Sequence, residues 1–264
     1  MKSGPNRMSL FKCLAIVAMA AISNANAADC PHKGVLGTSR VLAVDAKTYP
    51  RVGLKSFPQT LPLADKEIVL TFDDGPFPRT TAKILASLAS ECVQATFFLI
   101  GRSAQANPQI VRKIADAGHS IGHHTWSHPT LNRIDQAAAI SDIDRGIEAD
   151  EHALHAETKS TTEFFRFPGF VSTPLLLDTL KSRNIAVFGT DIWASDWNVM
   201  SPRQELRLLT SRLEAAGKGI ILLHDTKIQT ANMLPAFLQY LRKNGYKIVH
   251  VVPAAANKSS PDEK

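Results

Sequence analysis

Short apolar runs alternate with segments of helical periodicity over most of the chain. Residues 68–72 (IVLTF) form an apolar run that is rich in β-branched side chains and ends at Asp-Asp-Gly-Pro. A short continuous run of this composition predicts a strand that is buried on both faces. Six further strands are predicted, at residues 95–100, 119–122, 164–167, 185–189, 220–224 and 247–251.

The segments between these strands have the spacing and the end signals of helices. Within residues 80–91, the side chains of Ile84, Leu85 and Leu88 fall on one helical face. Asn107-Pro108 provides a cap followed by a proline in the first turn, and Gly118 follows the last turn of that helix. The predicted helices cover residues 80–91, 107–117, 135–157, 173–182, 202–216 and 231–243.

This alternation predicts an α/β domain built on a parallel sheet. Parallel strands are joined by helical crossovers and covered by helices on both faces, which accounts for their continuous apolar sequences. Seven strand–helix units in about 190 residues favour a single distorted, seven-stranded (β/α) barrel, with an open doubly wound sheet as the alternative. We expect an N-terminal extension at residues 28–65, the domain at 66–252 and a flexible tail at 253–264.

The first 27 residues predict a secretory signal peptide. Three basic residues precede an apolar run at 13–22, and Ala25-Asn26-Ala27 fits a cleavage site. The apolar run is shorter than the roughly 20 residues that a membrane span requires. We therefore expect an exported protein, periplasmic or secreted, with no membrane span in the mature chain. A buried N-terminal helix or an uncleaved anchor is the alternative.

Charge and cysteine content limit which binding partners and which cellular compartment fit the sequence. Loss of the three basic residues before position 28 lowers the formal net charge from +6 to +3. No basic run or basic–aromatic stripe marks a nucleic-acid surface, so we discount nucleic acid as a partner. The oligomeric state is open, and a monomer is the expectation. After removal of Cys13, Cys30 and Cys92 form an even pair, and either a disulfide between them or two unpaired thiols would fit an exported chain.

Polar residues with catalytic potential follow five of the predicted strands. The carboxyl ends of parallel strands meet at one rim of a barrel, so these side chains should converge there. Carboxylates, histidines and an arginine at one rim are the composition of a metal-dependent hydrolase site. The set comprises Asp73, Asp74, His123, His124, His128, Arg166, Asp191, Asp196, Trp197, His224 and Asp225.

Five short segments, in this order, resemble the polysaccharide deacetylase family, also called the NodB-homology domain or carbohydrate esterase family 4. They are Thr71-Phe-Asp-Asp-Gly-Pro76, His124-Thr-Trp-Ser-His128, Arg166-Phe-Pro-Gly169, Asp196-Trp197 and Leu222-Leu-His-Asp225. The resemblance covers residues 66–252. It implies a distorted (β/α) barrel and a hydrolase that deacetylates an N-acetylated glycan, whether chitin oligosaccharide, peptidoglycan or exopolysaccharide.

The resemblance also implies a division of roles. Asp74, His124 and His128 would hold a divalent metal, with zinc the best match to these ligands and Co²⁺ or Ni²⁺ as alternatives. A water on that metal would attack the acetyl group. Asp73 would then act as general base and His224 as general acid.

Supporting residues follow from the same resemblance. Arg166 would hold Asp73, with Asp196 oriented against Arg166. The backbone N–H of Gly169 would stabilise the oxyanion, and Trp197 and Leu222 would form the pocket for the acetyl methyl.

The chain departs from the family pattern at two positions. Gly169 stands where the family commonly has an aromatic residue, which leaves the groove wall and the substrate open. His123 stands where asparagine is frequent, and we expect it to take no part. Asp225 is expected to support His224.

Three other functions remain open on the sequence alone. An O-acetyl esterase of the xylan type would use the same chemistry, and a small-molecule cyclic amide hydrolase would use the same fold. A carbohydrate-binding domain that has lost catalysis is less compatible with the sequence. Such a domain would be expected to lack Asp73 or His224, and both are present.

Overall fold

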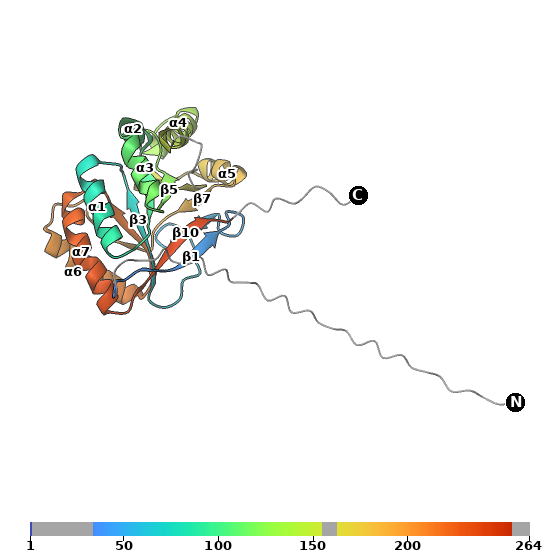
Figure 1. The fold of residues 1–264 in the computed structure, drawn as a ribbon. Coiled ribbons are helices and arrows are strands. Elements are labelled where there is room, and N and C mark those ends of the chain that lie inside the picture. The colour runs from blue at the N-terminus through green and yellow to red at the C-terminus, as the bar shows by residue number, and fades with distance from the viewer. Residues whose placement is uncertain (2–33, 155–162, 255–264) are drawn as a thin grey trace.

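Parallel strands form one curved sheet in the computed structural model, which describes residues 34–154 and 163–254 together with Met1. Helices lie on the outside of this sheet (Figure 1). All seven predicted strands are present, and each of their pairings is parallel. They are β3 (Glu67–Asp73), β4 (Thr96–Leu99), β5 (Ser120–His123), β6 (Phe164–Phe165), β7 (Ala186–Phe188), β9 (Gly219–His224) and β10 (Lys247–Pro253).

Three additional strands extend the sheet beyond the prediction. β1 (Thr38–Val44) pairs with β10 and β2 (Arg51–Val52) pairs with β7, so the N-terminal extension is part of the sheet. β8 (Ile192–Trp193) pairs with β9. Among the described residues no backbone pairing joins β8 to β7 or β2, and the ring of strands is open there. The fold is therefore an α/β barrel with one unpaired seam.

The predicted helices are all present, and residues 155–157 of the helix predicted at 135–157 lie outside the described residues. One further short helix, α2, precedes α3. The helices are α1 (Pro78–Ser90), α2 (Gly101–Ala106), α3 (Pro108–Asp116), α4 (Gln136–Leu154), α5 (Pro174–Ser182), α6 (Pro202–Ala216) and α7 (Ile228–Lys243).

Burial of the strands on both faces explains their continuous apolar sequences. β3 is buried along its whole length, with Phe72 stacked on Phe97 of β4 at a ring distance of 5.1 Å. On the outer side, Ile84 and Leu88 of α1 are fully buried in the same core. Covering both faces holds the strand ends in place, and these ends carry the polar residues discussed below.

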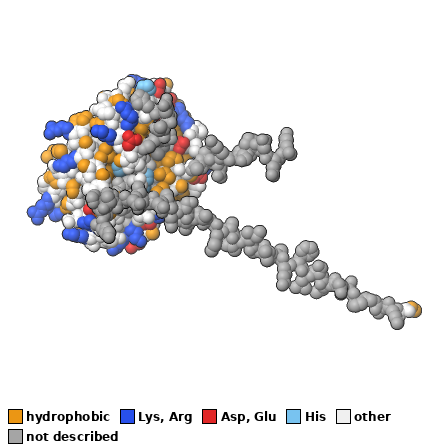
Figure 2. Space-filling view, in the orientation of Figure 1, with side chains coloured by type: hydrophobic (Ala, Val, Ile, Leu, Met, Phe, Trp, Pro, Cys, Tyr) orange, Lys and Arg blue, Asp and Glu red, His pale blue; other side chains and the backbone are white. Residues whose placement is uncertain are grey.

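The surface agrees with the modest net charge. Lys and Arg side chains are scattered over the face in Figure 2 and form no single basic patch on it. In the described part of the chain, no helix combines the length and the apolar character needed to cross a membrane. The predicted signal peptide, Cys30 and residues 255–264 of the predicted tail lie outside the described residues, so the Cys30–Cys92 disulfide stays a prediction.

Two glycines bring α2 and α4 against the loop that follows β5. A Cβ on Gly101 would lie 2.8 Å from Cα of Gly146, and a Cβ on Gly146 would lie 2.5 Å from the carbonyl carbon of Thr125. Real Cβ atoms do not approach backbone this closely. The loop at Thr125 can lie this close to the two helices because neither position carries a side chain.

We predict that Gly146→Ala displaces this loop. Alanine favours an isolated helix by about 1 kcal/mol over glycine, but here the added methyl collides with backbone. The melting temperature should fall, measured by calorimetry. Ser141→Ala, at an exposed position of the same helix, is the control. Wild-type stability in Gly146→Ala would contradict this account.

Candidate active site

Two consecutive aspartates at the end of β3 point in different directions. Asp73 is buried, and its Oδ1 accepts a hydrogen bond from Nη1 of Arg166 at 2.7 Å. Asp74 has a φ of 78°, in the left-handed region that side chains rarely adopt. Its Oδ1 lies 3.5 Å from Nε2 of His124 and 3.4 Å from Nε2 of His128. The change of backbone conformation separates the surroundings of the two carboxylates.

Asp74, His124 and His128 fit a metal ion. Their ligand atoms lie within 4.8 Å of one another, and Oδ1 of Asp74 is buried without a hydrogen-bond partner. Nδ1 of His124 lies 2.7 Å from the carbonyl oxygen of Arg166 and must donate to it, so Nε2 faces Asp74 with its lone pair. Two imidazole nitrogens and one carboxylate form a set that Zn²⁺ accepts, with positions left open.

Electrostatics favour the metal-binding protonation states. Burial raises the pKa of Asp74, but its interactions with His124, His224 and His128 hold it well below its usual range. Burial and the neighbouring His124 lower the pKa of His128. An ionised carboxylate and a neutral imidazole are the forms that coordinate metals.

The loop between the two histidines is held by its neighbours in an uncommon conformation. Thr125 and His128 have φ values of 65° and 60°, and the His128 N–H donates to Oγ1 of Thr125 at 3.0 Å. Asp142 of α4 accepts from the N–H groups of Trp126 and Ser127. Non-glycine residues in this region cost about 1–3 kcal/mol each, and the surrounding hydrogen bonds compensate for that cost. No sequence signal singled out Asp142.

Arg166 lies at the centre of the barrel with no exposed surface. Nη1 donates to Asp73 and to Thr71 Oγ1, Nη2 donates to the Gly189 carbonyl at 2.8 Å, and the guanidinium lies 4.3 Å from the ring of Phe98. Burial lowers the pKa of Arg166, and the Asp73 carboxylate opposes that shift. Arg166 therefore contacts Asp73, as expected, and joins three strands.

The expected contact between Asp196 and Arg166 is wrong, because Asp196 contacts His224 instead. Its Oδ1 accepts from Nδ1 of His224 at 2.7 Å, and Oδ2 accepts from the His224 backbone N–H at 2.7 Å. The reason is β8, which pairs with β9 and places the loop carrying Asp196 beside the end of β9. Burial lowers the pKa of His224, but the hydrogen bond to Asp196 and the surrounding carboxylates outweigh burial and raise it to about 9.

A cavity of about 320 Å³ opens over these groups. Phe167 and Phe170 line it although the sequence did not identify them, and Phe170 has a φ of 60°. Arg166 and Asp196 lie behind the lining. Arg166 is hydrogen-bonded to the lining residues Asp73 and His124, and Asp196 is hydrogen-bonded to His224. The predicted site residues on the wall are Asp73, Asp74, His124, His128, Gly169, Trp197, Leu222 and His224.

Other polar residues at the strand ends serve the scaffold. Asp225 does not support the His224 side chain as expected, because its Oδ2 accepts from Thr81 Oγ1 at 2.6 Å. His123 points to α4, where Nδ1 lies 2.8 Å from the buried Asp150. Asp191 accepts from the backbone N–H groups of Leu54 and Ile220.

Comparison with known proteins identifies the family of this chain. Residues 61–188 match the family described as polysaccharide deacetylase. A peptidoglycan-N-acetylglucosamine deacetylase of Bacillus cereus is 32% identical over 199 residues, covering 72% of this chain and 89% of that protein. A chitooligosaccharide deacetylase of Rhizobium leguminosarum bv. trifolii is 30% identical over 199 residues, covering 70% and 89%.

A solved structure shares the fold. The peptidoglycan deacetylase Bd3279 of Bdellovibrio bacteriovorus matches with a TM-score of 0.74 and 28% identity, covering 84% of this chain and 61% of that chain. The chain spans 39% of the length of another curated relative. The fold and site define an α/β-barrel protein with a candidate metal centre. The chain belongs to the polysaccharide deacetylase family.

We predict that Arg166→Met strongly destabilises the fold. Methionine fills part of the space but leaves Asp73 buried without its cationic partner, a change that typically costs about 3–5 kcal/mol. Chemical denaturation of the two proteins measures the loss. The double variant Arg166→Met/Asp73→Asn removes the unpaired charge and should recover part of the stability. An equal loss in the single and double variants would contradict this explanation.

Proposed function

We propose that this protein is an exported, metal-dependent N-deacetylase of an acetylated glycan. The observation that carries the proposal is the separation of the adjacent Asp73 and Asp74 at one cavity. Asp74 faces two histidines, whereas Asp73 is held by Arg166 and lies 3.9 Å from Nε2 of His124 through its other oxygen. One carboxylate is thus available to a metal and the other to a proton.

Asp74, His124 and His128 would hold the metal, with zinc the best match to this ligand set. When bound there, a divalent metal polarises a carbonyl oxygen and lowers the pKa of water. The hydrogen bond from His124 to the Arg166 carbonyl fixes the ring that presents Nε2. This arrangement orients the ligands before the ion arrives.

Asp73 is proposed as the general base. Arg166 holds Oδ1 at 2.7 Å, which leaves Oδ2 on the cavity side to take a proton from the attacking water. His224 is proposed as the general acid. Asp196 holds its Nδ1–H, so Nε2 faces the cavity, 4.0 Å from Asp74 Oδ2, where it can protonate the departing amine.

The cavity walls favour a sugar-linked acetamide. Leu222 and Trp197 would receive the acetyl methyl group, and the N–H of Gly169 would donate to the oxyanion. Trp197 lies 6.0 Å from the ring of His224 and is half exposed, so it also offers a face for a sugar. Two of the relatives are named for peptidoglycan and for chitooligosaccharide, and we propose N-acetylglucosamine polymers of these two kinds as substrates.

We predict acetate release from N-acetylglucosamine oligomers or peptidoglycan by the zinc-loaded protein. Asp73→Asn should retain zinc but lose at least about 100-fold in kcat, because the proton acceptor is removed. Asp74→Ala should lose zinc binding. Acetate assays and metal analysis of all three proteins give the result. Zinc-loaded protein that leaves these glycans untouched but cleaves O-acetylated xylan or a cyclic amide would contradict the proposal.

Phe170 is predicted to replace the aromatic wall that Gly169 lacks. The Phe170 side chain lines the cavity directly after the glycine. Phe170→Ala should raise KM for an oligomer by about tenfold with little change in kcat, since it removes apolar contact with the sugar and no reacting group. Leu175→Ala, which is exposed on α5 and does not line the cavity, is the control. An unchanged KM would show that Phe170 does not contact substrate.

A further inference from the structure

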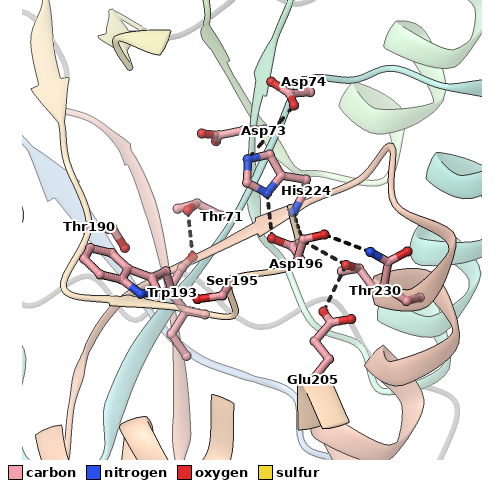
Figure 3. A network of polar contacts seen from close by, with 12 residues as sticks. Thr71, Asp73, Asp74, Thr190, Trp193, Ser195, Asp196, Glu205, His224 and Thr230 are labelled. Atoms are coloured by element: carbon pink, nitrogen blue, oxygen red, sulfur yellow. Dashed lines mark hydrogen bonds and ion pairs between the residues drawn. The ribbon is translucent and has the colours of Figure 1, made fainter. Parts of the chain in front are cut away.

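A buried polar chain continues behind His224 to helix α6 (Figure 3). His224 donates to Oδ1 of Asp196, Oδ2 of Asp196 lies 2.8 Å from Thr230 Oγ1, and Thr230 Oγ1 lies 2.9 Å from Oε1 of Glu205. Thr230 comes from α7 and Glu205 from α6. Asp196, Thr230 and Glu205 have no exposed surface. The proposed roles of Asp73, Asp74 and His224 do not require Glu205.

The number of hydrogens in this chain limits its protonation. A threonine hydroxyl has one hydrogen, and an ionised carboxylate can only accept. Thr230 Oγ1 lies at hydrogen-bond distance from two carboxyl groups, so its hydrogen can serve only one of them. The other carboxyl must itself donate to Thr230 for both contacts to be hydrogen bonds.

The surroundings decide which carboxyl carries the proton. Asp196 accepts from the backbone N–H and Nδ1–H of His224 as well as from Thr230, which stabilises its ionised form. Within the described residues, Thr230 is the one hydrogen-bond partner of the Glu205 carboxyl group, and its Oε2 is buried without a partner. Burial and the nearby Asp196 charge raise the pKa of Glu205 to about 7.

We propose that Glu205 is a positioning residue that acts as a neutral carboxylic acid. It donates its proton to Thr230 Oγ1 and thereby directs the Thr230 hydrogen to Asp196. Asp196 then remains ionised with three donors and holds the His224 ring in the orientation whose Nε2 faces the cavity. The charged groups that act on Glu205 are Asp196 and His224.

Ionisation of Glu205 would reverse this arrangement. The Thr230 hydrogen would turn toward Glu205, Asp196 would lose one donor, and a second buried negative charge would stand beside it. The orientation of His224 would then be less well defined. The contact between Glu205 and the site is indirect, so its effect should depend on its proton and not only on its volume.

The protonation state can be measured directly by infrared difference spectroscopy. The spectra of wild type and Glu205→Gln are recorded on full-length protein at pH 6 and subtracted. The difference spectrum should show a carboxylic acid C=O band that is present in wild type and absent from the variant. Thr230→Val removes the hydroxyl that accepts from Glu205, and the same band should move to higher frequency. Absence of the band in wild type, or a band unaffected by Thr230→Val, would overturn the proposal.

Thermal unfolding provides a second readout that is independent of enzymatic activity. A carboxyl whose pKa is higher in the folded than in the unfolded protein loses stabilisation as pH rises between the two values. The melting temperature of wild type relative to Glu205→Gln should therefore fall between pH 5 and pH 8. A difference in melting temperature between wild type and Glu205→Gln that is constant with pH would show a packing role alone. A rise in the melting temperature of wild type relative to the variant over this pH range would show an ionised Glu205. Either result would overturn the proposal.

The kinetic test rests on the proposed deacetylase function. Glu205→Gln keeps an N–H donor for Thr230, so it should stay within about threefold of wild-type kcat at pH 6 and retain more activity than wild type at higher pH. Thr230→Val should lower kcat by about tenfold with KM unchanged, because Asp196 loses a donor. Equal losses in both variants at every pH would overturn the positioning role. Inactive wild type would count against the deacetylase function, whereas the infrared and unfolding results would still decide the state of Glu205.

Discussion

The charge pair between Arg166 and Asp73 lies at the centre of this molecule, and both side chains are buried in the barrel. A guanidinium without exposed surface must have nearly all its donors satisfied, since an unpaired buried charge is very costly. Arg166 reaches Thr71 and Asp73 on β3 and two carbonyl groups at the end of β7, and its own carbonyl fixes the His124 ring. One residue thus links the barrel interior, the proposed base and a proposed metal ligand.

The pair also explains how two neighbouring aspartates acquire different surroundings. Asp73 continues the strand and is held by Arg166 inside the barrel. Asp74 leaves the strand with a positive φ and turns toward His124 and His128. His128 also has a positive φ, and the loop that carries it is held by Asp142 and by the close approach of Gly146. Three of the non-glycine residues with positive φ, Asp74, Thr125 and His128, therefore lie where the proposed ligands converge.

The sequence predicted the central strands and helices because their apolar periodicity reflects burial on both faces of the sheet. It did not predict β2 and β8, since two residues are too few to show any period, nor α2, which spans six residues. The partner expected for Asp196 came from the resemblance and was wrong, because the pairing of β8 with β9 brings that carboxylate to His224. Most of the predicted lining residues follow from their place at the strand ends, and Gly169 and Leu222 from the resemblance. Phe170, Asp142 and Glu205 were not predicted, since their roles depend on which distant segments they contact.

The most direct test of the central claim is a crystal structure of the zinc-loaded protein with anomalous scattering data at the zinc edge. The account predicts zinc bonded to Asp74, His124 and His128, at about 2.0–2.2 Å, with Asp73 still paired with Arg166. Zinc bonded to Asp73, or a broken pair between Asp73 and Arg166, would contradict the separation of the two aspartates.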